Sequence, residues 1–311
     1  MRNTFIKTLT KIAEQRPDVW LVCGDLGYSV LEEFATRFPE RYINAGVAEQ
    51  NMAGMAAGLA MAGKTVFLYS IGNFPTFRCL EQIRNDVCAH RASVKVVAVG
   101  AGYAYGPQGY THHALEDVAV MGALPHMEVF VPCDPIETEA ATHAISESGA
   151  PAYLRLSRSG EPKLHTAALS DARAPVMLRK GGDVTILACG PVVQDCLAAA
   201  DLLAAEGVVV QVATLPCVKP LDEAFVQAAA DASRLLVTVE EHVLWGGLHA
   251  SVAGCLAVHE RRPRILGIGV SDEIRASAAA GDRAALLKRA GLDAASIAAR
   301  IRSAAGAAKA R

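Results

Sequence analysis

The chain has 311 residues, enough for two ordinary domains, and its 30 basic and 32 acidic residues give a formal net charge of −2. This balance excludes a global attraction to nucleic acid or anionic lipid, so small molecules and other proteins are the expected partners. Apolar residues make up 52% of the chain and aromatic residues only 5%. Such a composition is typical of closely packed α/β proteins.

The cysteines and the hydrophobic runs indicate the cellular compartment in which the protein works. None of the eight cysteines belongs to a Cys-x-x-Cys pair or has histidines nearby at zinc-finger spacing, so we expect a reducing environment and no metal ligands from this chain. The first residues lack the apolar core of a secretory signal. A membrane span needs about 18 apolar residues in a row, and no stretch of the chain approaches this length. We expect a cytoplasmic protein.

Apolar strand-like runs alternate with helix-length segments in the first half of the chain. We expect helices at 5–13, 48–61, 80–89 and 135–146, and strands at 19–23, 65–69, 94–99, 128–131 and 152–156. This alternation predicts a parallel sheet covered by helices on both faces. Ligand-binding loops are then expected at the carboxyl ends of the strands.

A second α/β unit follows a linker. Residues 161–180 carry two prolines and mixed charge without periodicity, which indicates a linker between a domain at 1–160 and another at 181–311. In the second domain we expect strands at 183–188, 208–212, 235–239 and 264–268, and helices at 192–205, 247–258 and 284–290. The alanine-rich tail from 294 to 311 is expected to begin as a helix and then to fray.

Glu49 is a lone carboxylate among small and apolar residues, at a point where a loop becomes a helix. A carboxylate in such a place must pair with a cation, stay neutral or hydrogen-bond a ligand. Taken alone, Glu49 is explained most simply by its position in the first helical turn, which stabilises a negative charge by about 0.3–1 kcal/mol.

Two further segments follow expected strands. The loop 106–113, Gly-Pro-Gln-Gly-Tyr-Thr-His-His, lies where an active-site loop of this architecture belongs. Its adjacent histidines have no acidic ligand spacing and make a poor metal site, so a surface or packing role is the simplest interpretation of the motif alone. Segment 70–77 carries aromatic residues, which are more often core than a cofactor platform.

Taken together, these segments resemble the transketolase family, which uses thiamine diphosphate. The string Asn-Ala-Gly-Val-Ala-Glu-Gln-Asn-Met around Glu49 is similar to the family's catalytic-glutamate segment, and the Thr111-His112 pair looks like its substrate loop. The resemblance implies that Glu49 hydrogen-bonds the cofactor's aminopyrimidine and promotes deprotonation of the thiazolium carbon. It also implies that His112 contacts donor hydroxyl oxygens and assists proton transfer, with His113 in a supporting position and Gln108 beside the substrate.

The resemblance implies further contacts with the cofactor. Phe74 and Phe77 would pack around the aminopyrimidine, and Ile71 stands where a further aromatic residue is often found.

Three polar residues are candidates for binding a sugar or its phosphate: Arg2, Ser29 and Arg158. Arginine presents a planar fork of donors that suits phosphate. Two departures from the family put the donor sugar in doubt. Gln108-Gly109-Tyr110 replaces the usual Asp-Gly-Pro, and Gly100 stands where a phosphate-contacting histidine is often found.

The chain lacks the Gly-Asp-Gly segment, with a later asparagine, that holds magnesium and the cofactor's diphosphate in this family. The resemblance covers only the pyrimidine-binding and C-terminal domains. We therefore predict the small subunit of a split transketolase, in which a separate N-terminal-type subunit holds Mg²⁺ and the diphosphate. A dimer of heterodimers, α2β2, is the expected assembly.

Three alternatives stay open. Deoxyxylulose-phosphate synthase has similar motifs but is normally one chain. The β subunit of a 2-oxo-acid dehydrogenase is split in the same way but usually lacks these strings. A non-catalytic scaffold could keep the pyrimidine-domain fold, although it would need neither Glu49 nor His112.

Overall fold

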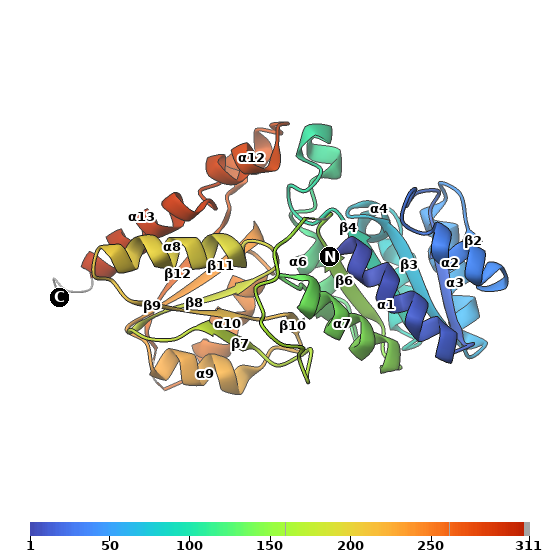
Figure 1. Cartoon of the computed structure of the whole chain (residues 1–311), viewed down its shortest axis with the longest axis horizontal. Helices are drawn as coiled ribbons and strands as arrows, with labels where there is room; N and C mark the ends of the chain where they lie inside the picture. Colours follow the sequence, from blue (N-terminus) through green and yellow to red (C-terminus); the bar gives the residue numbers. More distant parts are fainter. Residues whose placement is uncertain (159, 261, 308–311) are drawn as a thin grey trace.

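The computed structural model describes residues 1–158, 160–260 and 262–307, which form two α/β units lying side by side along the long axis (Figure 1). Six parallel strands of the first unit pair in the order β5-β6-β4-β3-β1-β2. They are β1 (Val19–Cys23), β2 (Tyr42–Asn44), β3 (Thr65–Ile71), β4 (Val94–Val99), β5 (Glu128–Phe130) and β6 (Ala152–Leu156). The parallel sheet predicted from the alternating pattern is confirmed.

Helices cover both faces of this sheet because side chains alternate along each strand. Phe67 and Tyr69 of β3 point into a core formed with α1 (Arg2–Gln15) and α7 (Pro135–Glu147), which pack on each other. Val66 and Leu68 face the opposite core, under α3 (Glu49–Met61). The remaining helices are short: α2 (Glu32–Arg37), α4 (Phe74–Phe77), α5 (Leu80–Gln82), α6 (Asp117–Gly122), the π-helical η2 (Ile83–Cys88), and the 3-10 turns η1 (Pro39–Arg41), η3 (Gly106–Gln108) and η4 (Tyr110–His112).

The second unit is built on a five-stranded sheet in the order β12-β11-β8-β9-β7. Its strands are β7 (Val176–Arg179), β8 (Val184–Cys189), β9 (Val210–Thr214), β11 (Leu235–Val243) and β12 (Arg264–Val270). All are parallel except β7, which pairs antiparallel with β9. Its helices are α8 (Val193–Ala205), α9 (Glu223–Asp231), α10 (Leu248–Ala257), α11 (Asp272–Ala276), α12 (Arg283–Arg289) and α13 (Ala294–Ala307).

Two short strands differ from the expected division of the chain. Strand β7 lies inside the segment 161–180 expected as a linker, where it forms a half-buried sheet edge. Strand β10 (Cys217–Lys219) comes from the sequence expected for the second domain, yet it pairs antiparallel with β5 of the first sheet. Strands of three or four residues carry too little periodicity to be recognised from the sequence.

A buried polar network joins the two units. Arg155 in β6 donates from Nε to Asp117 at 2.7 Å, and its Nη2 donates to the backbone oxygen of Glu241 in β11 at 3.1 Å. Burial alone would raise the pKa of Asp117, but Arg155, His242 and the hydrogen bond from Tyr153 together outweigh it and hold that pKa below its usual range. The carboxylate of Glu241 in turn accepts from the backbone N–H of Tyr103 at 2.7 Å.

Within the described ranges, no helix is long and apolar enough to cross a membrane.

Candidate active site

The site lies where β3 and β4 end. The segments that follow these neighbouring strands contact each other. Asn73 donates from Nδ2 to the backbone oxygens of Thr111 at 3.2 Å and His113 at 2.8 Å. These bonds fasten the segment after β3 to the loop 106–113. The second unit supports the same loop, since the N–H of Gly281 donates to the oxygen of Gly106 at 3.2 Å.

Glu49 is the first residue of α3 and its side chain is only 7% exposed. Its Oε1 accepts a hydrogen bond from Nη1 of Arg78 at 2.9 Å. The Arg78 guanidinium also lies 3.9 Å from the centre of the Phe74 ring, in a cation–π contact. Of the three possibilities open to this carboxylate, the structure therefore shows pairing with a cation.

His112 contacts the same Phe74 ring. The two ring centres are 5.3 Å apart and the rings meet edge to face at 69°. His112 Nδ1 is 3.0 Å from Oγ1 of Thr111. Partial burial, together with the charge of Arg78, lowers the pKa of His112 from its usual value, which favours a neutral imidazole at neutral pH.

Tyr105 connects His112 to Arg158. Its ring centre is 6.4 Å from that of His112, and the Arg158 guanidinium lies 5.0 Å from the Tyr105 ring. The ring also explains Gly100, whose φ is +99° and where a Cβ would lie 2.2 Å from Cδ2 of Tyr105. The ring of Tyr105 therefore fills the space that a side chain at position 100 would occupy.

Three other residues were predicted to contact the cofactor or the substrate. Phe77 is 40% exposed and, with Phe74, Arg78 and Thr111, lines a cavity of about 530 Å³. Ile71 is half-buried at the end of β3, and Gln108 is exposed in η3.

Arg2 and Ser29 are set further from Glu49 and His112. Arg2 opens α1 near Tyr69, where its charge offsets part of the burial that raises the pKa of Tyr69. Ser29 is exposed in the loop after β1, and its N–H donates to Glu32 at 2.6 Å. Among the described residues, no side-chain hydrogen bond joins Arg2 or Ser29 to Glu49 or His112.

Arg78, Asn73 and Tyr105 contact the predicted site residues but were not singled out from the sequence. The spacing of Arg78 offers a signal in retrospect, since it lies four residues after Phe74 in a helical turn and therefore on the same side. Tyr105 could not have been found in this way, because its contact with Arg158 depends on the path of an irregular loop.

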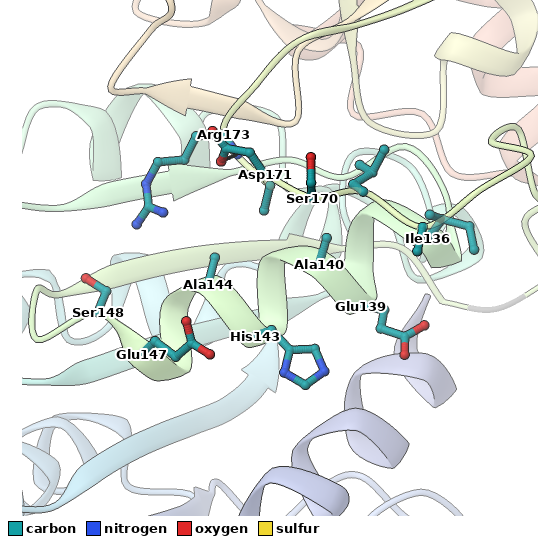
Figure 2. Close-up of a pocket in the computed structure, with 13 residues that line it drawn as sticks. Ile136, Glu139, Ala140, His143, Ala144, Glu147, Ser148, Ser170, Asp171 and Arg173 are labelled. Atoms are coloured by element: carbon teal, nitrogen blue, oxygen red, sulfur yellow. Dashed lines mark hydrogen bonds between the residues drawn. The ribbon is translucent and has the colours of Figure 1, made fainter.

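A larger cavity of about 670 Å³ lies elsewhere, between α7 and residues 168–173 (Figure 2). Arg173, at its edge, is already paired with Glu128 at 2.6 Å. The predicted residues Phe74 and His112 instead lie in the segments after β3 and β4, with Glu49 joined to Phe74 through Arg78.

Comparisons with known proteins agree on one family. Residues 1–162 match the model of the transketolase pyrimidine binding domain, and residues 174–297 match that of the transketolase C-terminal domain. A putative transketolase C-terminal section of Methanocaldococcus jannaschii is 37% identical, covering 97% of this chain and 95% of that protein.

Two further relatives come from divided enzymes. One of the subunits of the apulose-4-phosphate transketolase of Phocaeicola vulgatus is 34% identical, covering 86% of each chain. A solved structure described as a split gene transketolase, inactive β4 tetramer, is 35% identical with a TM-score of 0.86, covering 97% of this chain and 96% of that one.

Proposed function

Since the chain belongs to the transketolase family, we propose that it is the small subunit of a split transketolase that moves a two-carbon ketol unit from a ketose to an aldose. The observation that carries this proposal is a grouping of three residues: Phe74 and His112 lie in the segments after β3 and β4, and Glu49 at the start of α3 joins Phe74 through Arg78.

The residues present fit the pyrimidine end of thiamine diphosphate. Glu49 supplies a largely buried carboxyl group suited to a ring nitrogen, and Phe74 and Phe77 supply apolar ring surface, with Ile71 at the strand end behind them. Thiamine diphosphate, when bound, supplies the carbanion chemistry, while the protein orients the reactants and moves protons. For Glu49 to hydrogen-bond the cofactor, Arg78 must share or release Oε1 of Glu49.

His112 is the proposed proton carrier and contact for donor hydroxyl groups. A neutral imidazole can accept a proton from one oxygen and return it to another, and the lowered pKa of His112 keeps it in that form. Arg158 is exposed beside Tyr105 and can meet a phosphate or another anionic group of the sugar. We propose Arg2, Ser29 and Gln108 as further contacts at the far end of the substrate.

The partner is a separate N-terminal-type subunit that holds Mg²⁺ and the diphosphate, in an α2β2 assembly. The chain's coverage of 86% of a transketolase subunit and 96% of a split-gene transketolase chain supports this division. The name of the solved relative, an inactive tetramer of β chains, is in keeping with it.

The decisive experiment purifies this chain with and without its partner subunit and measures ketol transfer from a panel of ketoses that includes apulose 4-phosphate. We expect activity only from the complex, with thiamine diphosphate and Mg²⁺ both required. Ketol transfer by this chain alone would refute the divided site.

Two controls separate the alternatives. Carbon–carbon bond formation or oxidation that depends on pyruvate, without ketol transfer, would favour the synthase or dehydrogenase relatives. If the complex binds no thiamine diphosphate in a titration, the chain is a scaffold and the proposal fails.

A further inference from the structure

A second group of reactive side chains lies at the junction of the two units, outside the proposed active site. Cys133 follows β5, Glu137 lies in the first turn of α7, and His165 lies in the segment between the two sheets. One Sγ, one carboxylate oxygen and one ring nitrogen from these residues all lie within 4.8 Å of one another. All three residues are nearly or fully enclosed by the protein.

The orientation of His165 is set by Asp134. Oδ2 of Asp134 is 3.0 Å from Nδ1 of His165 and also accepts from the backbone N–H groups of Leu164 at 2.8 Å and His165 at 3.0 Å. Because an ionised carboxylate only accepts hydrogen bonds, Nδ1 carries the proton. The lone pair of Nε2 therefore points away from Asp134 and toward Glu137.

Glu137 presents one free oxygen to this lone pair. Its Oε2 accepts from the backbone N–H of Cys133 at 2.6 Å, whereas Oε1 lies 3.5 Å from Nε2 of His165. Oε1 of Glu137, Nε2 of His165 and Oγ1 of Thr214 are buried and have no hydrogen-bond partner in the part of the chain that the structure describes. A buried acceptor without a partner is costly, and here two of them face each other.

We propose that Sγ of Cys133, Oε1 of Glu137 and Nε2 of His165 bind one divalent cation of the zinc class. Two ligands each about 2.0–2.1 Å from a tetrahedral zinc ion lie about 3.3–3.4 Å apart, close to the observed separation of Oε1 and Nε2. A set of one sulfur, one nitrogen and one oxygen suits Zn²⁺ and not Mg²⁺ or Ca²⁺.

The surroundings provide the other parts of such a site. A carboxylate that holds the far nitrogen of the histidine, as Asp134 does, is the usual outer support of a zinc ligand. Of the three ligand residues, Cys133 lines a cavity of about 430 Å³, which would give an ion a path to the group. The ion would tie together the end of β5, the start of α7 and the segment between the sheets.

The test uses the full chain, purified without chelators, in a metal analysis and a Co²⁺ titration followed by absorption. We expect one ion per chain and a thiolate-to-cobalt charge-transfer band. Cys133→Ala should abolish the band, and His165→Asn should weaken Zn²⁺ affinity at least about 100-fold, beyond the range for outer-shell partners. Cys88→Ala, which removes another fully buried thiol outside the group, should change neither the charge-transfer band nor the Zn²⁺ affinity.

Glu137→Gln provides a second test that preserves side-chain shape, and we expect it to weaken Zn²⁺ binding while circular dichroism stays unchanged. A folded wild-type chain that binds no Zn²⁺ or Co²⁺ would overturn the proposal and would mean that Glu137 and His165 share a proton instead. A cobalt band that persists in Cys133→Ala would overturn it as well. Neither readout depends on ketol transfer, so the metal site and the proposed function can fail separately.

Discussion

Nη1 of Arg78 lies 2.9 Å from Oε1 of Glu49, although the arginine side chain is 47% exposed and the glutamate side chain only 7%. An ion pair with one partner so open to water contributes little net stability, about 0–1 kcal/mol. A ligand can therefore displace the guanidinium from the carboxylate at small cost. We interpret Arg78 as a residue that pairs with Glu49, the proposed catalytic residue, until a cofactor binds.

Replacing Glu49 with Gln keeps the shape of the side chain and removes its acid function. We expect kcat for ketol transfer in the reconstituted complex to fall at or beyond the upper end of the about 10²–10⁴-fold range for acid–base residues. Glu81→Gln, which neutralises an exposed carboxylate in the same domain, is the matched control and should retain activity. Near-normal turnover in Glu49→Gln would remove Glu49 from the mechanism.

Replacing Arg78 separates its charge from its planar shape. Arg78→Met should change the thermal midpoint little, since the Arg78 side chain is half exposed. It should lower kcat/KM at least about 10-fold, because Glu49 and Phe74 lose their common contact. Arg78→Lys keeps the charge without the flat guanidinium and should recover activity only in part. Equal losses of stability and activity in Arg78→Met would instead indicate a purely structural residue.

The adjacent histidines should respond differently to the same substitution. His112→Asn removes the proposed proton carrier, and we expect at least about a 10²-fold loss of kcat with little change in stability. His113 is buried against Tyr103, with Nε2 3.2 Å from the Gly106 oxygen, so His113→Asn should cost about 1 kcal/mol of unfolding free energy. Urea unfolding and steady-state kinetics on both variants check the assignment, which the reverse pattern would contradict.

His242 in β11 should make the chain sensitive to acid. It is fully buried, with Nδ1 2.6 Å from the Val243 oxygen, and burial lowers its pKa to about 4. Between about pH 6.5 and pH 4 the unfolded chain binds a proton at this residue and the folded chain does not. The free energy of unfolding should therefore fall by about 3 kcal/mol as pH falls through this window.

Urea unfolding of wild type and His242→Gln at several pH values measures this contribution. The variant should show a shallower loss of stability on acidification, while His143→Gln, at an exposed position on α7, should follow wild type. Parallel acid profiles for wild type and His242→Gln would contradict the expectation.

The long elements could be predicted because their hydrophobic pattern is strong. Strands β1, β4 and β6 have the expected bounds, and the helices α3, α7 and α8 are close to expectation. The predicted helix at 80–89 instead combines α5 with the π-helical η2, a change of hydrogen-bond register that side-chain periodicity does not reveal.

The candidate site, like the fold, could be predicted only in part. Phe74 and His112 were recognisable because each sits in a motif that follows a predicted strand, and Glu49 because it opens a predicted helix within a motif of its own. The contacts that connect them come from Arg78 and Tyr105, whose positions depend on how two loops meet. The buried group at Cys133 was missed for the same reason, since His165 reaches it from another segment of the chain.

Strand β10 has a consequence for movement. Two domains that close around a substrate by hinge bending need a flexible connection between them. Here β10 is hydrogen-bonded into the first sheet, whereas β9 and β11, which precede and follow it in sequence, belong to the second sheet. Rotation of one unit against the other would have to break that ladder. We therefore expect the two units to move little against each other and to unfold as one cooperative body.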